Sequence, residues 1–530
     1  MNVAVVGSGI SGIFAAHALA TRGLSVTILD VGETLDATRQ MAVDKLHDLL
    51  PEHWPSAAYD LIRENNTFNK GVLPKKVHFG SDYIYANDRT FAPIRVMAKG
   101  RVPYPTFAKG GFSNIWGAAV LPPAECDMAD WPIPRSQMEP YFRKVAQILP
   151  LSGGEGTLSD AFPAYRDRLG DLDAGPQGQA LLEDLRRVGA TLRKRMTLYG
   201  KARLAVHTDS AGDALACIGC GHCFTGCVRG SIFSTLPMLN ELTRTLRVNY
   251  RSGLYVHKIE EHDGKPALHV VGTRTNEQQE MTFDAAFLAA GPINTTRLLL
   301  RSRQLYDRSV LLKESQKFVL PMLRLRGAPT AIEHPSVTLA SMFIEAKVSS
   351  QPAHWLHLQI APMNQMIFDG ARLGEALPLG KRLWRPLLRR MMAAWGGMHS
   401  DYSSHLELRL RQSNVGHNDV LELDLKPSEQ ARAAGRQAAK DLFILGLSFQ
   451  TLFCYWMLKF SNPGSGTHCG ASFPMRRRPV DLLDTDSYGR PFGWSRIFAV
   501  DSSVLPSIPG TTLAFAVMAN AYRIAQEAPM

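Results

Sequence analysis

The chain has 530 residues, of which 45% are hydrophobic and 20% charged, so it is long enough for two or three domains with a large core. Its formal net charge is +11, yet no recognition module or long basic run accompanies that charge, and we expect no nucleic-acid partner. Seven cysteines, four of them clustered, do not resemble a secreted disulfide framework. A strand is expected directly at the N-terminus, with no room for a signal peptide, which predicts a cytoplasmic protein.

The first thirty residues have the pattern of a dinucleotide-binding turn. An apolar strand at 3–6 runs into Gly-Ser-Gly-Ile-Ser-Gly, and apolar residues at helical spacing follow as far as Gly23. The three glycines allow, in order, the tight turn, the approach of the backbone to a pyrophosphate and close packing of the helix on the sheet. The N–H groups at the start of that helix would face the phosphates. The predicted cofactor-binding residues of this turn are Gly7, Ser8, Gly9, Ser11 and Gly12.

A second strand at 25–29 ends at Asp30. A carboxylate in that place accepts hydrogen bonds from ribose hydroxyls and repels a 2′-phosphate, which favours FAD or NAD over NADP. A strand-like segment at 282–290 and an apparent helix at 294–303 indicate the return of the same domain. An inserted antiparallel sheet that forms a substrate domain is predicted by strand patterns at 318–325, 336–347, 355–360, 405–411 and 420–425.

Two further segments are strongly apolar. Residues 381–392 mix basic and apolar residues with a tryptophan, which suits peripheral contact with an anionic surface such as the inner membrane. The alternative is a surface helix with one buried face. Residues 443–460 are interrupted by polar side chains, so a buried core helix is favoured there over a membrane span.

The chain resembles the glucose–methanol–choline (GMC) oxidoreductases, which are FAD enzymes that oxidise alcohols. The resemblance rests on segments 7–12, 110–117, 289–291 with 296–300, the C-terminal segments around His468 and Asp501, and 130–133 with 141–142. It implies an α/β fold in which a discontinuous Rossmann-type FAD-binding domain carries an inserted, mainly antiparallel substrate domain over the isoalloxazine ring. We expect the FAD-binding domain at 1–314 and 466–530 and the substrate domain at 315–465.

The resemblance also assigns cofactor contacts along the chain. Gly110 and Gly111 would let the backbone lie against the cofactor, while Ser113 and Asn114 can bond flavin heteroatoms. Some relatives have a covalently bound histidine where Ile115 stands, so isoleucine predicts non-covalent FAD. Asp501 and Ser502 would serve the pyrophosphate or ribityl chain, and Val256 the adenine. The remaining predicted cofactor-binding residues are Trp116, Ala290, Gly291, Thr511, Thr512 and Leu513.

His468 is the predicted catalytic base. Alcohol oxidation requires removal of the hydroxyl proton as hydride leaves carbon for flavin N5, and a neutral imidazole suits that proton transfer. The family usually has a second His or Asn where Thr512 falls, and threonine is no base at neutral pH. Either His468 acts alone while Thr512 orients the substrate oxygen, or another group, such as His399 or His405, enters the site.

Four clustered cysteines form the second signature. Cys217, Cys220, Cys223 and Cys227 have the C-x2-C-x2-C-x3-C spacing of a ferredoxin cluster, although valine rather than proline follows the last one. A single cluster would need Cys227 to fold back, or a remote ligand from Cys126, Cys454 or Cys469. The alternatives are an iron–sulfur cluster, as some electron-transferring GMC members carry, a zinc ion, and a reduced or disulfide-linked loop. A cluster would offer an electron exit to an external acceptor protein.

We therefore predict an FAD-dependent alcohol dehydrogenase or oxidase. The expected substrate is a sugar or glycoconjugate hydroxyl, with a long-chain or sterol alcohol as the next class. One alternative is a flavin and iron–sulfur electron-transfer or sensing protein that lacks alcohol oxidation, which the missing second His or Asn motivates. Another is a membrane-surface protein that uses the fold as a scaffold.

Overall fold

Short apolar segments from both ends and the middle of the chain form one parallel sheet in the computed structural model, which describes residues 1–64, 77–85, 95–98, 105–328, 339–362, 386–412, 419–464 and 466–530. Most residues of these strands are buried on both faces, as in parallel sheets generally, except in the edge strand at 248–251. In spatial order the sheet consists of β22 (Ile497–Ala499), β11 (Ala285–Leu288), β1 (Asn2–Val6), β2 (Ser25–Leu29) and β7 (Val248–Arg251).

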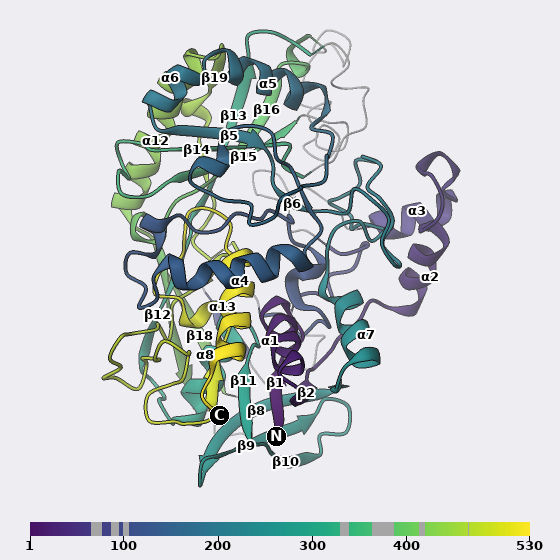
Figure 1. Cartoon of the computed structure of the whole chain (residues 1–530), viewed down its shortest axis with the longest axis vertical. Helices are drawn as coiled ribbons and strands as arrows, with labels where there is room; N and C mark the ends of the chain where they lie inside the picture. Colours follow the sequence, from purple (N-terminus) through teal and green to yellow (C-terminus); the bar gives the residue numbers. More distant parts are fainter. Residues whose placement is uncertain are drawn as a thin grey trace.

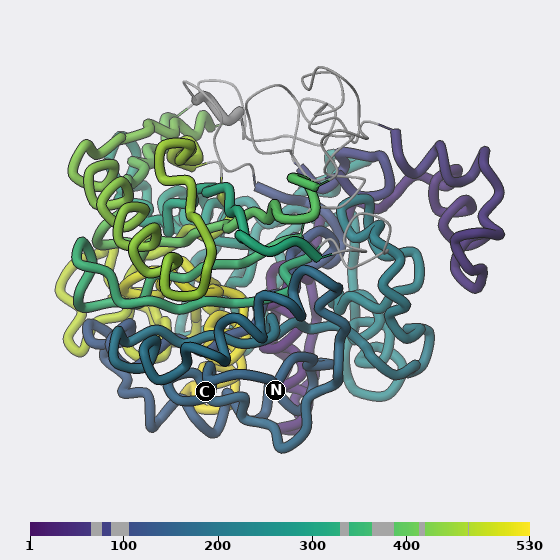
Figure 2. Tube along the Cα trace, turned by 90° about the horizontal axis from the view of Figure 1, so that it is seen from above, coloured from purple at the N-terminus to yellow at the C-terminus, as the bar shows by residue number. Residues whose placement is uncertain are grey.

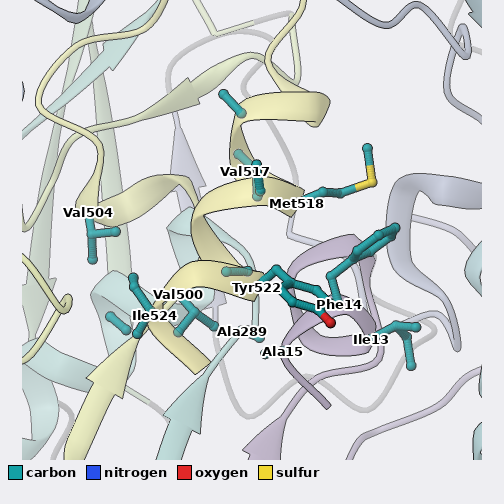
Figure 3. Packing of buried hydrophobic residues seen from close by; sticks show 14 of the residues in the cluster. Ile13, Phe14, Ala15, Ala289, Val500, Val504, Val517, Met518, Tyr522 and Ile524 are labelled. Carbon is teal, nitrogen blue, oxygen red and sulfur yellow. The ribbon is translucent and has the colours of Figure 1, made fainter. Parts of the chain in front are cut away.

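Two helices from opposite ends of the sequence cover one region of this sheet. Helix α1 (Ile10–Thr21) packs against α13 (Ala514–Glu527), and Phe14 lies among Val517, Met518 and Tyr522 of α13 (Figure 3). The two chain termini lie near one another in both overall views (Figures 1 and 2). The first and last segments of the chain therefore belong to one core.

An antiparallel meander and a helix complete this half of the molecule. The meander consists of β8 (Leu254–His262), β9 (Lys265–Gly272) and β10 (Gln278–Thr282). The segment predicted as one strand at 282–290 is two strands, because β10 ends at Thr282 in the meander and β11 starts at Ala285 in the parallel sheet. Helix α8 (Pro292–Ser302) confirms the helix predicted at 294–303.

A second, antiparallel sheet occupies the upper half of Figure 1. Its order is β19 (Thr451–Phe453), β13 (Lys317–Arg324), β16 (Met391–Gly397), β15 (Leu356–Pro362), β14 (Met342–Ala346) and β5 (Thr197–Lys201), and β20 (Lys459–Phe460) also pairs with β13. Alternate residues such as Phe318, Leu320 and Met322 form a core with α5 (Gly175–Arg187) and α12 (Glu429–Leu447). The opposite face, which carries Lys317 and Val319, is only half-buried on β13.

A third sheet links the two halves. It has the order β21 (Cys469–Gly470), β12 (Ser309–Glu314), β17 (His405–Arg411), β18 (Val420–Lys426) and β3 (Arg95–Ala98). The pair α2 (Ala37–Leu46) and α3 (Ser56–Arg63) projects from the body of the molecule (Figures 1 and 2). The remaining elements are α4 (Arg135–Ile148), β4 (Leu151–Ser152), α6 (Gly189–Lys194), β6 (Leu204–Ala205), α7 (Thr235–Thr245) and several short 3-10 turns.

The predicted fold class is confirmed: a discontinuous Rossmann-type domain carries a mainly antiparallel second sheet. The strands predicted at 318–325, 355–360, 405–411 and 420–425 correspond to β13, β15, β17 and β18, and 336–347 contains β14, with 336–338 outside the described residues. Strand β5, at 197–201, joins the antiparallel sheet although it lies outside the 315–465 segment.

One prediction about the apolar segments is wrong, and the other is only partly tested. Residues 443–460 do not form a core helix, because α12 ends at Leu447, Gln450 turns the chain with φ +55°, and Thr451–Phe453 pairs with β13. In the segment 381–392, residues 386–388 are helical, Met391 begins the central strand β16, and 381–385 lie outside the described residues, so the contact with an anionic surface stays a prediction. Within the described ranges, no helix has the length and apolar composition needed to cross a membrane.

Candidate active site

The glycine turn lies at the carboxyl end of the parallel sheet, between β1 and α1. The N–H of Gly7 donates to the Leu29 carbonyl at 2.9 Å, which ties the turn to β2. A Cβ atom on Gly12 would lie 2.0 Å from the Gly7 carbonyl oxygen, so this position accepts only glycine without a backbone shift. A Cβ atom on Gly9 would meet nothing within 4 Å. The space beside Gly9 is therefore open to a phosphate group.

The predicted flavin segment at 110–116 lies against this turn. A Cβ atom on Gly111 would be 3.3 Å from Gly9 Cα, and the Gly110 N–H donates to Ser8 Oγ at 2.8 Å. Asn114 donates to two backbone carbonyls, but its Oδ1 is buried and has no hydrogen-bond partner among the described residues. Ser113 is committed to the Gly110 carbonyl at 2.7 Å. The segment thus presents a free amide oxygen next to the dinucleotide turn.

Asp30 lies at the end of β2 and is almost fully buried. It accepts hydrogen bonds from the hydroxyls of Ser8 and, at 3.3 Å, Tyr250. Burial raises its pKa to about 6, although these hydrogen bonds favour the ionised form. The Leu254 N–H donates to the Asp30 carbonyl at 2.9 Å, which brings the start of β8, with the buried Val256, beside it. Asp30 therefore lies at the end of β2, where the ribose-binding carboxylate was predicted, and its role in binding ribose stays a prediction.

Asp30→Asn is expected to stabilise the FAD-free protein above pH 6 and to weaken FAD binding. The folded-state pKa of Asp30 exceeds its ordinary value, so the folding free energy lost to the ionised carboxylate accumulates as the pH rises to about 6 and stays constant above it, at up to roughly 3 kcal/mol. The amide can still accept from Ser8 and Tyr250, but it lacks the charge that favours ribose hydroxyls. Thermal unfolding at pH 5 and pH 8, with FAD titrations, checks both effects. A variant that is less stable than wild type at pH 8 would contradict the first.

The returning strands supply the remaining predicted contacts. Gly291, with φ +84°, precedes α8, and a Cβ atom there would meet nothing within 4 Å. Asp501, at the end of β22, accepts from Thr295 Oγ1 at 2.5 Å and from the Ser503 N–H at 2.9 Å. Burial raises the pKa of Asp501, and the bond from Thr295 opposes that shift. Ser502 donates to the Cys469 carbonyl at 2.8 Å and so holds β21, next to His468. Ala290 accepts from the Asn294 amide at 3.3 Å.

The loop before α13 differs from expectation in its hydrogen bonding. The Thr512 hydroxyl donates to the Leu121 carbonyl at 3.0 Å and accepts from the Leu121 N–H at 2.7 Å, so its only proton is already committed to the backbone. Thr511 Oγ1 is buried and has no hydrogen-bond partner among the described residues.

Two further predicted cofactor-binding residues are in place but have no special geometry. Leu513 is buried at the start of α13. Trp116 donates its indole N–H to the Phe233 carbonyl at 2.7 Å.

His468 lies just before β21 and is half-buried. Its Nδ1 is buried and has no hydrogen-bond partner among the described residues. Burial lowers the pKa of His468 well below its ordinary value, and the nearby Lys317 and His357 lower it further. The imidazole is therefore neutral at neutral pH, which is the protonation state that a base requires.

Of the two other histidines considered from the sequence, His399 lies beside the loop that precedes α13, where a Cβ atom on Gly510 would be 3.0 Å from the His399 backbone nitrogen, and its Nε2 has no hydrogen-bond partner among the described residues. His399 is 1% exposed and stacks on His354 with ring centroids 3.6 Å apart, and burial lowers its pKa to about 3. His405 belongs to β17 in the linking sheet, opposite Lys313 and Lys426. Two residues that the sequence did not single out approach His468, namely Lys317 and His357, and Glu345 is hydrogen-bonded to His357. The sequence signal that could have identified them is a charged or titratable residue within a short apolar strand.

The four clustered cysteines line one cavity, together with Val206, His222, Arg229 and Ile232. None of the four forms a disulfide in the described structure, and burial raises the pKa of Cys217 to about 12 and that of Cys220 to about 11. Among the described residues, no three of these sulfurs lie within 4.8 Å of one another. None of the remote candidates, Cys126, Cys454 and Cys469, is part of the described cavity wall.

The residues at the edge of the parallel sheet fit FAD. Gly9 and Gly291 leave open space where a side chain would otherwise stand, and Asn114 Oδ1 and Thr511 Oγ1 are buried polar atoms without partners in the described structure. Buried polar atoms of this kind are normally satisfied, so an absent ligand is the simplest account of them. The glycine turn and Gly291 follow the carboxyl ends of parallel strands, which is where dinucleotides bind in such folds.

Comparison with known proteins agrees with the class that this fold and site define, a dinucleotide-binding α/β protein with an antiparallel second sheet. Residues 5–60 match the NAD(P)-binding Rossmann-like domain family. No curated protein matches the sequence. Solved structures match over almost the whole chain. Pyridoxine 4-oxidase from Mesorbium loti has 14% identity and a TM-score of 0.59 over 99% of this chain and 98% of its own.

A second solved structure gives the same result. An FAD-dependent oxidoreductase from Chaetomium thermophilum, solved with a bound fragment, has 13% identity and a TM-score of 0.57, again over 99% of this chain and 98% of its own. At such low identity the two matches establish the fold alone. They show that the whole chain, and not only its first sixty residues, has the fold of these oxidoreductases.

Proposed function

We propose that the protein is an FAD-dependent oxidoreductase that oxidises an alcohol, with His468 as the base. The observation that carries the proposal is a neutral, partly accessible imidazole beside a cofactor cradle built from both ends of the chain. Two further features support it: the buried partnerless oxygens of Asn114 and Thr511, and the match in fold to two oxidoreductases.

The chemistry divides between the cofactor and the protein. FAD, held without a covalent bond by the turn at Gly7–Gly12, Asp30 and the segments at 110–116 and 501–513, would supply the hydride acceptor. His468 would accept the hydroxyl proton of the substrate, since its imidazole is neutral at neutral pH. Thr512 is less suited to orient the substrate as a donor, because its proton already goes to Leu121.

The face of the antiparallel sheet near His468 favours an apolar alcohol. Beyond Lys317 and His357, the next in-register row on this face consists of Val319, Trp395 and Gln359, followed by Pro321, Ala393 and Ala361. A sugar would need several polar groups to satisfy its hydroxyls, whereas this described part of the face offers Gln359. A long-chain, aromatic or sterol-type alcohol therefore fits it better than the sugar or glycoconjugate expected from the sequence.

An anaerobic substrate screen tests this proposal. Protein purified with its yellow cofactor is mixed with sugars, long-chain alcohols, aryl alcohols and sterols, and flavin bleaching is followed in the visible spectrum. Denaturation should release free FAD. Bleaching by one alcohol class supports the proposal and names that class. Bound FAD that no alcohol reduces, but that a protein donor reduces readily, would favour the electron-transfer or sensing alternative.

We further infer that the cavity of Cys217, Cys220, Cys223 and Cys227 holds an iron–sulfur cluster. Thiolates around one tetrahedral zinc lie about 3.8 Å apart, given Zn–S bonds of about 2.3 Å, whereas no three of the four described sulfurs here lie within 4.8 Å of one another. Ile232 in the cavity wall is followed by Phe233, whose carbonyl accepts the indole N–H of Trp116 in the flavin segment. This short covalent and hydrogen-bonded connection would carry electrons from the flavin to an external acceptor protein.

Anaerobically purified protein is expected to contain iron and acid-labile sulfide in equal amounts, and Cys220→Ser is expected to lose both while keeping FAD. The reason is that a thiolate ligand is removed without touching the glycine turn or Asp30. Metal analysis, sulfide assay and the visible and electron paramagnetic resonance spectra check this outcome. Cys454→Ser, outside the cavity wall, is the matched control. Stoichiometric zinc, or flavin without any metal, would contradict the cluster.

A further inference from the structure

A row of polar residues crosses the antiparallel sheet next to His468. Lys317 on β13 pairs with Gly397 on β16, Gly397 pairs with His357 on β15, and His357 pairs with Glu345 on β14. Residues in direct register across neighbouring strands present their side chains on the same face. Lys317, His357 and Glu345 therefore share one face, with a glycine gap between the lysine and the histidine.

The gap at Gly397 is occupied by the loop that precedes α13. A Cβ atom on Gly397 would lie 2.3 Å from the Gly510 carbonyl oxygen and 2.6 Å from Lys317 Nζ. The lysine ammonium and the loop backbone therefore meet over the same glycine. Gly510 is followed directly by Thr511 and Thr512, so the ammonium lies beside the segment where a second His or Asn was expected.

Ser315 links this ammonium to His468. Lys317 Nζ donates to Ser315 Oγ at 3.1 Å, and the Ser315 N–H donates to the His468 carbonyl at 3.0 Å. Gly466, two residues before His468, has its Cβ position 3.9 Å from Lys317 Cγ. The aliphatic part of the lysine side chain therefore runs along the segment that carries the base.

The charges around Lys317 leave it as the main cation of the row. Burial raises the pKa of Glu345 well above its ordinary value and lowers that of His357 well below, so this hydrogen-bonded pair, 2.5 Å apart, carries no net charge at neutral pH. Burial lowers the pKa of Lys317 to about 8, while Glu314 and Glu345 oppose that shift. The titratable groups that face this cluster are Glu314, Glu345, His357 and His468, with Asp127 and Arg203 acting on Glu345.

We propose that Lys317 is the second catalytic group of the site and donates a hydrogen bond to the substrate oxygen in place of the missing His or Asn. The proposal rests on the proposed function. The hydroxyl proton goes to His468, the hydride goes from carbon to oxidised FAD, and the substrate becomes a carbonyl compound. Lys317 keeps its protons and stabilises the negative charge that develops on oxygen. As a nearby cation it also holds His468 in the neutral form.

The decisive comparison is wild type against Lys317→Met and Lys317→Gln, with Lys440→Met on the exposed side of α12 as the control. The probe that does not depend on turnover is benzoate, whose carboxylate mimics the developing alkoxide and perturbs the spectrum of bound FAD. Both Lys317 variants are expected to bind benzoate at least ~10-fold more weakly, because a charge-assisted bond is lost. In wild type the same binding is expected to fade as the pH rises through about 8, where Lys317 loses its proton.

Kinetics give the second measurement. With an alcohol that reduces the wild-type flavin, the Lys317 variants should reduce it ~100-fold more slowly, with the acid limb of the pH profile moved to higher pH, since His468 regains a higher pKa. Benzoate binding and reduction within twofold of wild type, with the control unchanged, would overturn the role of Lys317 alone. A wild-type protein whose FAD no alcohol reduces would overturn the proposed function itself, and this role with it.

Discussion

His468→Ala is expected to slow the reduction of bound flavin by an alcohol ~10²- to 10⁴-fold, the usual contribution of a positioned general base. The physical reason is that His468 is half-buried and neutral, whereas His399 is 1% exposed and stacked on His354, and His357 is hydrogen-bonded to Glu345. Stopped-flow spectrophotometry without oxygen measures the rate directly. FAD content should not change, because His468 is not one of the residues predicted to bind FAD, such as those of the glycine turn and Asp30.

The matched control is His262→Ala, which removes an exposed imidazole at the end of β8. It should behave as wild type in both rate and FAD content. A second variant, His468→Gln, keeps a hydrogen-bonding side chain but cannot act as a base near neutral pH, and it should be as slow as the alanine variant. Wild-type rates in either His468 variant would assign the proton transfer to another group.

The dinucleotide half of the molecule could be predicted because its signals are local. A glycine turn flanked by two short apolar strands and an acidic residue determines strand, helix, strand and ligand carboxylate within thirty residues. The structure places Gly7, Asp30 and Asp501 at the carboxyl ends of β1, β2 and β22, on one edge of one sheet. The convergence of both chain ends on this edge was likewise expected from the motifs.

The antiparallel half was predicted less well, because its strands are short and apolar. The sequence pattern of such segments is equally compatible with a buried helix. Residues 443–460 show this ambiguity: the apolar composition is shared by the end of α12 and by β19 and β20, and only pairing with β13 decides between them. Strand β16 was missed for a related reason, since its small residues follow a strongly basic segment.

The neighbours of His468 could not be predicted from spacing at all. Lys317, Glu345 and His357 lie on three different strands, and their meeting depends on the register of four strands and on the glycine at 397. A shift of one residue in any pair would turn one of these side chains to the helix-covered face. Thr512 shows the converse: the family resemblance predicted it in the site, but its hydroxyl is hydrogen-bonded to the Leu121 backbone.

Gly9→Ala and Gly12→Ala are expected to separate the binding of FAD from the folding of its cradle. Gly9 has φ −66° and no atom within 4 Å of a Cβ, so alanine should leave the unfolding temperature of the FAD-free protein unchanged. Its methyl group would occupy the space beside the turn that a pyrophosphate needs, and FAD affinity should fall at least ~10-fold. Fluorescence titration of the FAD-free protein measures that affinity.

Gly12→Ala should instead lower both the unfolding temperature and the affinity for FAD. Its Cβ atom would lie 2.0 Å from the Gly7 carbonyl oxygen, so the backbone at Gly7 or at Gly12 would have to shift. Gly189→Ala at the start of α6, where a Cβ atom would only touch the Tyr199 hydroxyl at 3.5 Å, controls for the added methyl group. If Gly9→Ala bound FAD as wild type does, the pyrophosphate would have to lie away from this turn. Equal loss of stability in both variants would mean that Gly9, too, serves packing and not the cofactor.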